Sequence, residues 1–116
     1  MSSFKLDLEK QASSNDSLTL YKATGKLSLE TANEFGQKMR AETASHLVLD
    51  LSRVSFLDSA GVGSLVSLFV NRRNQGKTFA LAALSPQSTA VVMVAGLQNL
   101  LPVYKTVEDA VAKKTA

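Results

Sequence analysis

The sequence predicts an α/β domain with a small mixed β-sheet that opens with a hairpin and carries about four packed helices. Two observations favour this fold. The first two segments alternate apolar and polar residues with the period of a half-buried strand. From residue 28 onward, helical and strand-like patterns follow one another along the chain, which is typical of layered α/β proteins. A length of 116 residues fits one domain, which we place at residues 1–116.

The first half of the chain contains two strands and a helix. Residues 4–9 and 18–23 alternate with period two, and the turn-forming residues 13–16 between them indicate a hairpin, which we expect to end at Gly25. Ser28 is then a suitable N-cap. The apolar residues that follow it recur at helical spacing, so an amphipathic helix of three to four turns is expected.

The middle of the chain repeats the alternation of strand and helix. Residues 47–51 and 54–57 form a nearly continuous apolar run, which predicts an inner strand covered on both faces. Apolar residues from Val62 onward return to helical spacing, and Gly76 suits the position just after a helix. Residues 78–82 then predict another buried strand.

The last part of the chain predicts two more helices. Ser85 followed by Pro86 is a helix start, and Gly96 suits its end, although the β-branched residues between them also suit a strand. If this segment is a helix, Val92 or Met93 can be exposed and form a self-association or partner site. Residues 102–105 predict a short strand and residues 107–114 a final helix.

Composition excludes several function classes. The chain has no cysteine, so disulfide frameworks, iron–sulfur clusters and thiol nucleophiles are excluded, and its single histidine cannot supply a multi-histidine metal site. We therefore expect no metal and no cofactor. The net charge is +3, but the basic residues are scattered and aromatic residues make up 6%, which does not favour direct nucleic-acid binding.

The N-terminal residues lack the apolar run of a signal peptide, and no apolar stretch approaches the ~20 residues that span a membrane. We therefore expect a cytoplasmic protein without membrane insertion.

Two glycine motifs only partly match nucleotide-binding patterns. Residues 76–78 end like a phosphate-binding loop, but Asn71 replaces its first glycine and the order is helix then strand. Gly61 and Gly63 match two glycines of a dinucleotide fingerprint, whereas the third position is Val66. We interpret both as structural turns.

Other polar residues also have structural interpretations. His46, Asp50 and Ser59 lack the surrounding pattern of a catalytic triad, so we interpret His46 as a surface residue and Asp50 as a strand-end or turn residue. Arg72 and Arg73 are expected on the solvated face of a helix.

Asp58 and Ser59 lie where a buried strand leads into a helix. Asp58 suits the N-cap, which leaves the Ser59 hydroxyl at the exposed start of the helix. Free N–H groups and a partial positive charge at that end would stabilise a phosphate. Helix capping alone is the simpler interpretation, and modification of Ser59 is the alternative.

The segment Asp58-Ser59-Ala60-Gly61-Val62-Gly63, with the strand before it, resembles the signature of the STAS family. That family comprises bacterial anti-sigma factor antagonists and a related domain of anion transporters. Residues 24–27, 83–86 and 96–97 also resemble family motifs. Where the family usually has an aspartate after its Gly-x-Leu motif, this chain has Ser28, which can still cap the helix.

The resemblance implies a regulatory binding protein that is not an enzyme. An anti-sigma factor that is also a serine kinase would bind the unphosphorylated form and release the sigma factor. Phosphorylation of Ser59 would break the complex, and a serine phosphatase would restore it. The residues implied in partner binding are Thr24, Gly25, Lys26, Ser28, Asp58, Ser59, Ala60, Gly61, Val62 and Gly63.

Two alternatives remain at this point. Some members of the family are scaffold subunits of stress-signalling complexes or accessory subunits of lipid-transport ATPases. The glycine pairs alone would support a nucleotide-binding or hydrolytic protein. Between Ser59 and Val107 there is no acidic residue, so a phosphate on Ser59 would change the sign of a basic-to-neutral region, which favours the switch.

Overall fold

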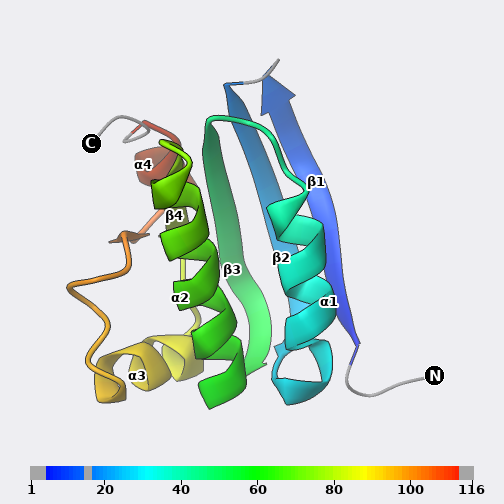
Figure 1. Cartoon of the computed structure of the whole chain (residues 1–116). Coiled ribbons are helices and arrows are strands. Elements are labelled where there is room, and N and C mark those ends of the chain that lie inside the picture. The colour runs from blue at the N-terminus through cyan, green and yellow to red at the C-terminus, as the bar shows by residue number, and fades with distance from the viewer. Residues whose placement is uncertain (1–4, 15–16, 113–116) are drawn as a thin grey trace.

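A five-stranded sheet with strand order β1-β2-β3-β4-β5 forms the centre of the computed structural model, which describes residues 5–14 and 17–112 (Figure 1). β1 and β2 are antiparallel, and each later strand is parallel to its neighbour. This arrangement confirms the predicted mixed sheet. In chain order the elements are β1 (Leu6–Ser14), β2 (Leu18–Leu27), α1 (Leu29–Arg40), β3 (His46–Leu57), α2 (Ser59–Asn74), β4 (Thr78–Ala82), α3 (Pro86–Val94), β5 (Val103–Tyr104) and α4 (Val107–Ala112).

The hairpin of β1 and β2 is longer than its sequence pattern predicts. β1 continues to Ser14, while residues 4, 15 and 16 lie outside the described residues. The pairing of the hairpin ends at Gly25, opposite Leu6, as predicted, whereas β2 itself continues to Leu27 beside β3. Gly25 permits this with a φ of +120°, and a Cβ at that position would overlap the carbonyl oxygen of Lys5. β2 therefore passes through Gly25 without ending, with a register irregularity relative to β3 between Gly25 and Lys26.

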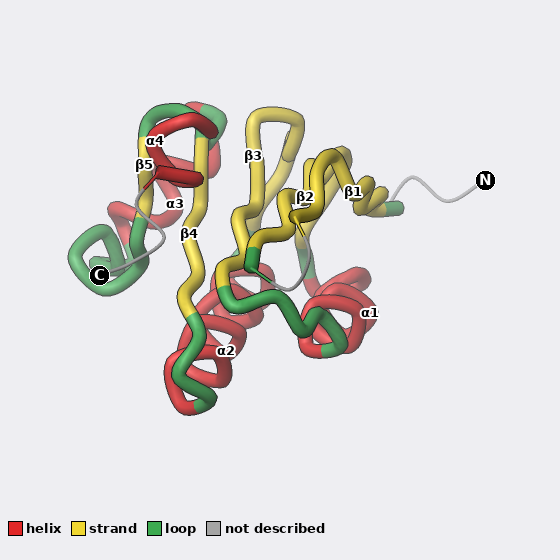
Figure 2. Tube along the Cα trace, turned by 90° about the horizontal axis from the view of Figure 1, so that it is seen from above, coloured by secondary structure: helices red, strands yellow, loops and turns green. Residues whose placement is uncertain are grey.

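β3 is the central strand, and its first half is buried on both faces, as predicted. Leu47, Leu49 and Leu51 belong to the larger hydrophobic cluster, whereas Val48 belongs to a smaller cluster with Ala110 of α4. Figure 2 shows the reason, with α1 and α2 on one face of the sheet and α4 on the other. The alternation of side chains along β3 thus supplies both layers.

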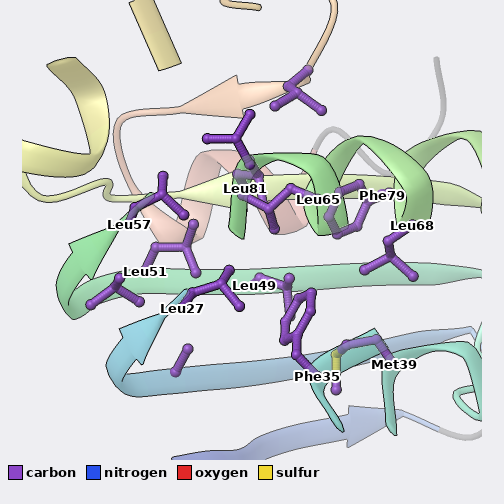
Figure 3. Packing of buried hydrophobic residues seen from close by; sticks show 14 of the residues in the cluster. Leu27, Phe35, Met39, Leu49, Leu51, Leu57, Leu65, Leu68, Phe79 and Leu81 are labelled. Carbon is purple, nitrogen blue, oxygen red and sulfur yellow. The ribbon is translucent and has the colours of Figure 1, made fainter. Parts of the chain in front are cut away.

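The larger cluster joins the sheet to the helices on one face. Phe35 and Met39 of α1 and Leu65 and Leu68 of α2 are all at most 1% exposed. Figure 3 shows these side chains packed over leucines of the strands. Burial of each such side chain is worth roughly 1.5–3 kcal/mol, so this layer fixes α1 and α2 against the sheet.

The helix ends follow the predicted capping residues. Ser28 has extended backbone before α1, and its N–H donates to Thr31 Oγ1 at 3.0 Å. Ser85 accepts from the Ser88 N–H at 3.2 Å and precedes Pro86, so the ambiguous segment after it is a helix. Gly76 follows α2 with a φ of +72°. The predicted last helix is observed to Ala112, and residues 113–116 lie outside the described range.

His46 is buried, so its interpretation as a surface residue is wrong. It is 2% exposed, with Nδ1 2.7 Å from Thr78 Oγ1 and Nε2 2.9 Å from the Ala110 carbonyl oxygen. α4 covers this end of β3, which a local sequence pattern does not reveal. Asp50 is also not at a strand end, because β3 continues past it, and its Oδ1 accepts from the Ser52 N–H at 2.9 Å.

Arg72 is likewise buried, at 2% exposed, so the predicted solvated face is right only for the exposed Arg73. The Arg72 guanidinium donates to the Thr78 carbonyl at 2.9 Å, the Ala44 carbonyl at 2.6 Å and the Glu42 carbonyl at 3.5 Å. Burial lowers the pKa of Arg72 from its ordinary value, and the nearby Glu42 carboxylate partly opposes this. The side chain ties the end of α2 to the starts of β3 and β4.

Glu42, in the loop after α1, holds the same end of the sheet together. Its carboxylate accepts from the Thr19 hydroxyl at 3.1 Å and from the Ala44 N–H at 3.0 Å. Burial raises the pKa of Glu42, but these hydrogen bonds and the charge of Lys10, 3.9 Å away, outweigh burial and bring the pKa below 4.5. The folded protein therefore stabilises the ionised form.

Within residues 5–14 and 17–112, no helix has both the length and the apolar character that a membrane span requires. The same residues contain no group of three or more His, Cys, Asp or Glu side chains placed to hold a metal ion.

Candidate functional site

The two segments implied in partner binding meet at the carboxyl end of the sheet. β2 and β3 are parallel neighbours, with Lys26 opposite Phe56 and Leu27 opposite Leu57. The loop that follows β2 and the turn that follows β3 therefore emerge side by side. The parallel pairing brings residues 24–28 and 58–63 together, although about thirty positions separate them in sequence.

Asp58 connects the first turns of two helices. Its Oδ1 accepts from the Gly61 N–H at 2.8 Å, which confirms the predicted N-cap of α2. Its Oδ2 accepts from the Leu29 N–H at 3.2 Å, at the start of α1. No local pattern in the sequence predicts this second bond, because residue 58 and residue 29 lie far apart in the chain. One carboxylate thus lies at the positive ends of two helix dipoles and fixes their relative position.

Gly61 allows α2 to begin close to the end of β2. A Cβ on this buried residue would overlap the carbonyl oxygen of Leu27 and lie 2.8 Å from Leu57 Cδ1. Only a residue without a side chain fits this approach of helix and strand backbones. Gly61 therefore sets the depth at which the start of α2 lies against the sheet.

Ser59 is the first residue of α2, and it is exposed. Among the other predicted binding residues, Ser28, Gly61 and Val62 are buried and shape the site from below. The remaining six are exposed or half-buried, namely Thr24, Gly25, Lys26, Asp58, Ala60 and Gly63. A partner that approaches this edge of the sheet would meet those residues together with the Ser59 hydroxyl.

An apolar groove of about 630 Å³ lies on one side of Ser59, between α2 and α3. We call it the α2–α3 groove. Its walls are Ser59, Val62, Gly63 and Val66 from α2 and Ala90, Val91, Val94, Ala95 and Leu97 from α3 and the loop after it. Nearby, Met93 is 56% exposed, whereas Val92 is 2% exposed, so Met93 is the exposed residue of the pair singled out by the sequence. No local sequence pattern predicts the groove itself, because its two walls come from segments about thirty residues apart in the chain.

On the other side of Asp58, a smaller hollow of about 300 Å³ lies against Lys26, Ser28, Glu30, Ser55 and Phe56. Leu29, next to it in the chain, is 73% exposed, and Phe56 is 42% exposed. Exposed large apolar side chains grouped around a site are typical of protein-binding surfaces. Apolar surface therefore lies on both sides of the exposed serine.

Two of the enzymatic arrangements considered for these residues do not occur in the structure. His46 begins β3 and Ser59 follows its end, so the length of a 12-residue strand separates them and they form no triad. Residues 76–78 connect the end of α2 to the start of β4, which is the reverse of a phosphate-binding loop.

The model of the STAS domain family matches residues 9–110 of this chain. The chain belongs to the STAS family. A curated relative, the anti-sigma F factor antagonist of Paenibacillus polymyxa, is 19% identical over 103 residues, which cover 85% of this chain and 88% of that protein. The family resemblance noted in the sequence is therefore confirmed.

Solved structures confirm the STAS fold. An anti-sigma factor antagonist from Mycobacterium paratuberculosis superposes with a TM-score of 0.84 at 23% identity, over 97% of both chains. The unphosphorylated form of the anti-sigma factor antagonist SpoIIAA superposes with a TM-score of 0.73 at 19% identity, over 94% of this chain and 95% of that one. The order of sheet and helices is therefore that of the family.

Proposed function

We propose that this STAS protein is an anti-sigma factor antagonist, a binding protein without catalytic activity whose complex is broken by phosphorylation of Ser59. The observation that carries the proposal is the exposed Ser59 hydroxyl on the first turn of α2, where the two predicted binding segments meet. The names of its relatives support the same role, and SpoIIAA has been solved in both unphosphorylated and phosphorylated forms. We expect the protein to act in the cytoplasm.

A phosphate on Ser59 is compatible with the fold. The side chain is exposed at a helix N-terminus, where free N–H groups and the helix dipole favour negative charge. Asp58 brings one carboxylate close to the same point, but hydrogen bonds from Gly61 and Leu29 hold it. Phosphorylation therefore changes the surface and leaves the domain folded.

The same phosphate is incompatible with a close apolar interface. It adds about −1.5 to −2 charges at pH 7 to a wall of the α2–α3 groove. The walls of the groove come from residues 59–71 and 78–104, which contain no charged residue, so a partner segment that fits the groove has no reason to carry a matching cation there. Desolvation of the dianion would then oppose binding strongly.

The reaction is carried out by the partner. The anti-sigma factor acts as a serine kinase, with ATP and Mg²⁺ bound on the kinase. Ser59 Oγ attacks the γ-phosphorus, its proton passes to a base of the kinase, and ADP leaves. A serine phosphatase returns the hydroxyl by hydrolysis. This chain contributes the nucleophilic oxygen and its position.

The first test is incubation with the cognate anti-sigma factor kinase and ATP. Intact mass should rise by about 80 Da, the mass of one phosphoryl group. Ser59→Ala should abolish the increase. Ser67→Ala is the matched control, because Ser67 is also exposed on α2, and this variant should be phosphorylated normally. Phosphorylation of the Ser59→Ala variant would contradict the proposal.

A second test measures binding of the same anti-sigma factor by calorimetry. Ser59→Asp should weaken binding by at least about tenfold, since it places a permanent charge in the interface. Ser59→Ala should bind within about twofold of the unmodified protein. If the Ser59→Asp variant bound the anti-sigma factor as tightly as the unmodified protein, the phosphorylation switch would be contradicted.

A further inference from the structure

The α2–α3 groove carries an inference that rests on the proposed function. We infer that an uncharged, aliphatic segment of the anti-sigma factor docks in this groove, so that the groove is the part of the interface that senses the charge of Ser59. Three observations support it: the groove is continuous with Ser59, the segments that form its walls contain no charged residue, and Gly63 keeps it open.

The surroundings of the groove are unusual for a protein surface. Residues 59–71 and 78–104 contain no Asp, Glu, Lys, Arg or His, although they include all of α3 and most of α2. Val94 is nevertheless 90% exposed and Met93 is 56% exposed. Soluble proteins normally intersperse charges over such a surface. An exposed aliphatic helix face without charge indicates a surface that an apolar partner covers.

Gly63 is a glycine that the fold does not require. It lies inside α2, its φ is not in the left-handed region, and a Cβ there would meet no atom within 4 Å. A glycine in a helix interior is less stable than an alanine, so the packing of this chain gives no reason for it. Its neighbour Gly61 differs, because a Cβ there would overlap the Leu27 carbonyl oxygen. The missing side chain at Gly63 instead keeps space free in the wall of the groove.

The position of Ser59 favours a segment of the anti-sigma factor as the molecule bound in the groove. Ser59 is itself a wall residue of the groove, so a segment bound there would lie against the phosphorylated oxygen. A phosphate would force this apolar contact either to desolvate a dianion or to separate. An anionic membrane surface is a poorer occupant, because such surfaces attract Lys and Arg, which the rim lacks.

The test compares groove variants in binding to the purified anti-sigma factor. Val94→Lys and Val94→Glu should each weaken binding about tenfold or more, because either charge is poorly accommodated against an aliphatic segment. Both should fold normally, since Val94 is almost fully exposed. Val103→Lys is the matched control, because Val103 is 39% exposed and outside the groove, and its affinity should stay within about twofold.

Gly63→Ala distinguishes an effect on binding affinity from an effect on the stability of the fold. It should raise the melting temperature by about 3–5 °C through helix propensity and still weaken binding about fivefold or more, because the added methyl would project into the space that the bound segment occupies. A variant that is more stable and binds equally well would overturn the role of Gly63. Hydrogen exchange in the complex with unmodified protein should also show protection of residues 90–97, and its absence would overturn docking in the groove.

The remaining outcomes are also decisive. If the unmodified chain fails to bind the anti-sigma factor, the proposed function fails, and this inference fails with it. If it binds and the Val94 variants bind equally well, only the groove is overturned. Opposite effects of Val94→Lys and Val94→Glu would indicate a charged partner surface. A dimer of the free chain that these variants dissociate in sedimentation would show that a second copy occupies the groove. Either result would overturn the inference.

Discussion

The two ends of α2 use polar groups in opposite ways. At its carboxyl end, the charged side chain of Arg72 is buried and bonded to three carbonyl oxygens, and His46 and Glu42 are bonded nearby. At its amino end, Ser59 is exposed beside aliphatic surface, and Asp58 makes the local polar connections. Hydrogen bonds hold the first end together, while the second leaves apolar surface open.

This difference shows where the chain can change without unfolding. A buried cation with three acceptors has no substitute of the same shape, so the Arg72 end tolerates few changes. At the amino end, the exposed Ser59 side chain supports little of the core, so charge or bulk can be added at this residue at small cost. A regulatory modification is therefore expected at the amino end of α2 and not at its carboxyl end.

The largest expected loss of stability comes from a substitution at the carboxyl end of α2. Arg72→Ala removes the guanidinium donors that bond the carbonyls of Thr78, Ala44 and Glu42, and it leaves a cavity. We expect a loss of about 3–5 kcal/mol in the free energy of unfolding, measured by urea denaturation.

Arg73→Ala is the matched control for that variant. Arg73 is exposed, with its guanidinium carbon 5.4 Å from the centre of the Phe69 ring. Its removal should change stability by at most about 0.5 kcal/mol. Equal losses from the two variants would mean that the buried carbonyl network is not what stabilises this end.

The next largest expected loss of stability concerns the packing of the amino end of α2 against β2. Gly61→Ala should cost about 2–3 kcal/mol, because the new methyl would overlap the Leu27 carbonyl oxygen and push α2 from β2. Thermal denaturation compares it with Gly63→Ala, which should be stabilising. If both alanines were tolerated equally, the close approach at Gly61 would not hold in solution.

A smaller effect links the Glu42 end to pH. The pKa of Glu42 is lowered in the folded protein, so its contribution is complete above its usual value of 4.5 and is lost as pH falls through the folded pKa. Glu42→Gln should cost about 1 kcal/mol at pH 7. The difference between the two proteins should shrink below pH 4.5, and a difference that stays constant down to pH 2 would contradict the ionised network.

The smallest effect sharpens the contrast at the amino end. Ser59→Asp places a negative charge at the first turn of α2, where the dipole favours it. The free energy of unfolding should stay equal or rise by up to about 0.5 kcal/mol in the same urea assay. A loss above about 1 kcal/mol would show that this end cannot carry charge and would weaken the case for phosphorylation.

Local patterns predicted the elements but not the buried polar groups. The Asp58 cap and the helix after Pro86 follow from capping chemistry, whereas the two binding segments are implied only by the family resemblance. The prediction of an exposed Arg72 is wrong because it rests on the charge of the residue and not on its position along the helix. It lies seven residues after Leu65 and four after Leu68, on the same buried stripe of α2. That spacing was the available signal.

His46, the Asp58–Leu29 bond and the α2–α3 groove could not have been found locally. Each depends on two segments that lie about thirty or more residues apart in the chain. Only the parallel order of the strands and the placement of α3 and α4 bring them together.

The edges of the sheet have a consequence for solubility. β5 offers only the two residues Val103–Tyr104, and β1 carries a register break between Lys10 and Ala12 along with the charges of Asp7 and Glu9. Short, irregular or charged edges are poor templates for another strand. A protein that exposes an aliphatic surface for a partner is at risk of self-assembly when the partner is not bound. With both edges blocked, we expect that risk to be confined to the helical surface, where partner binding relieves it.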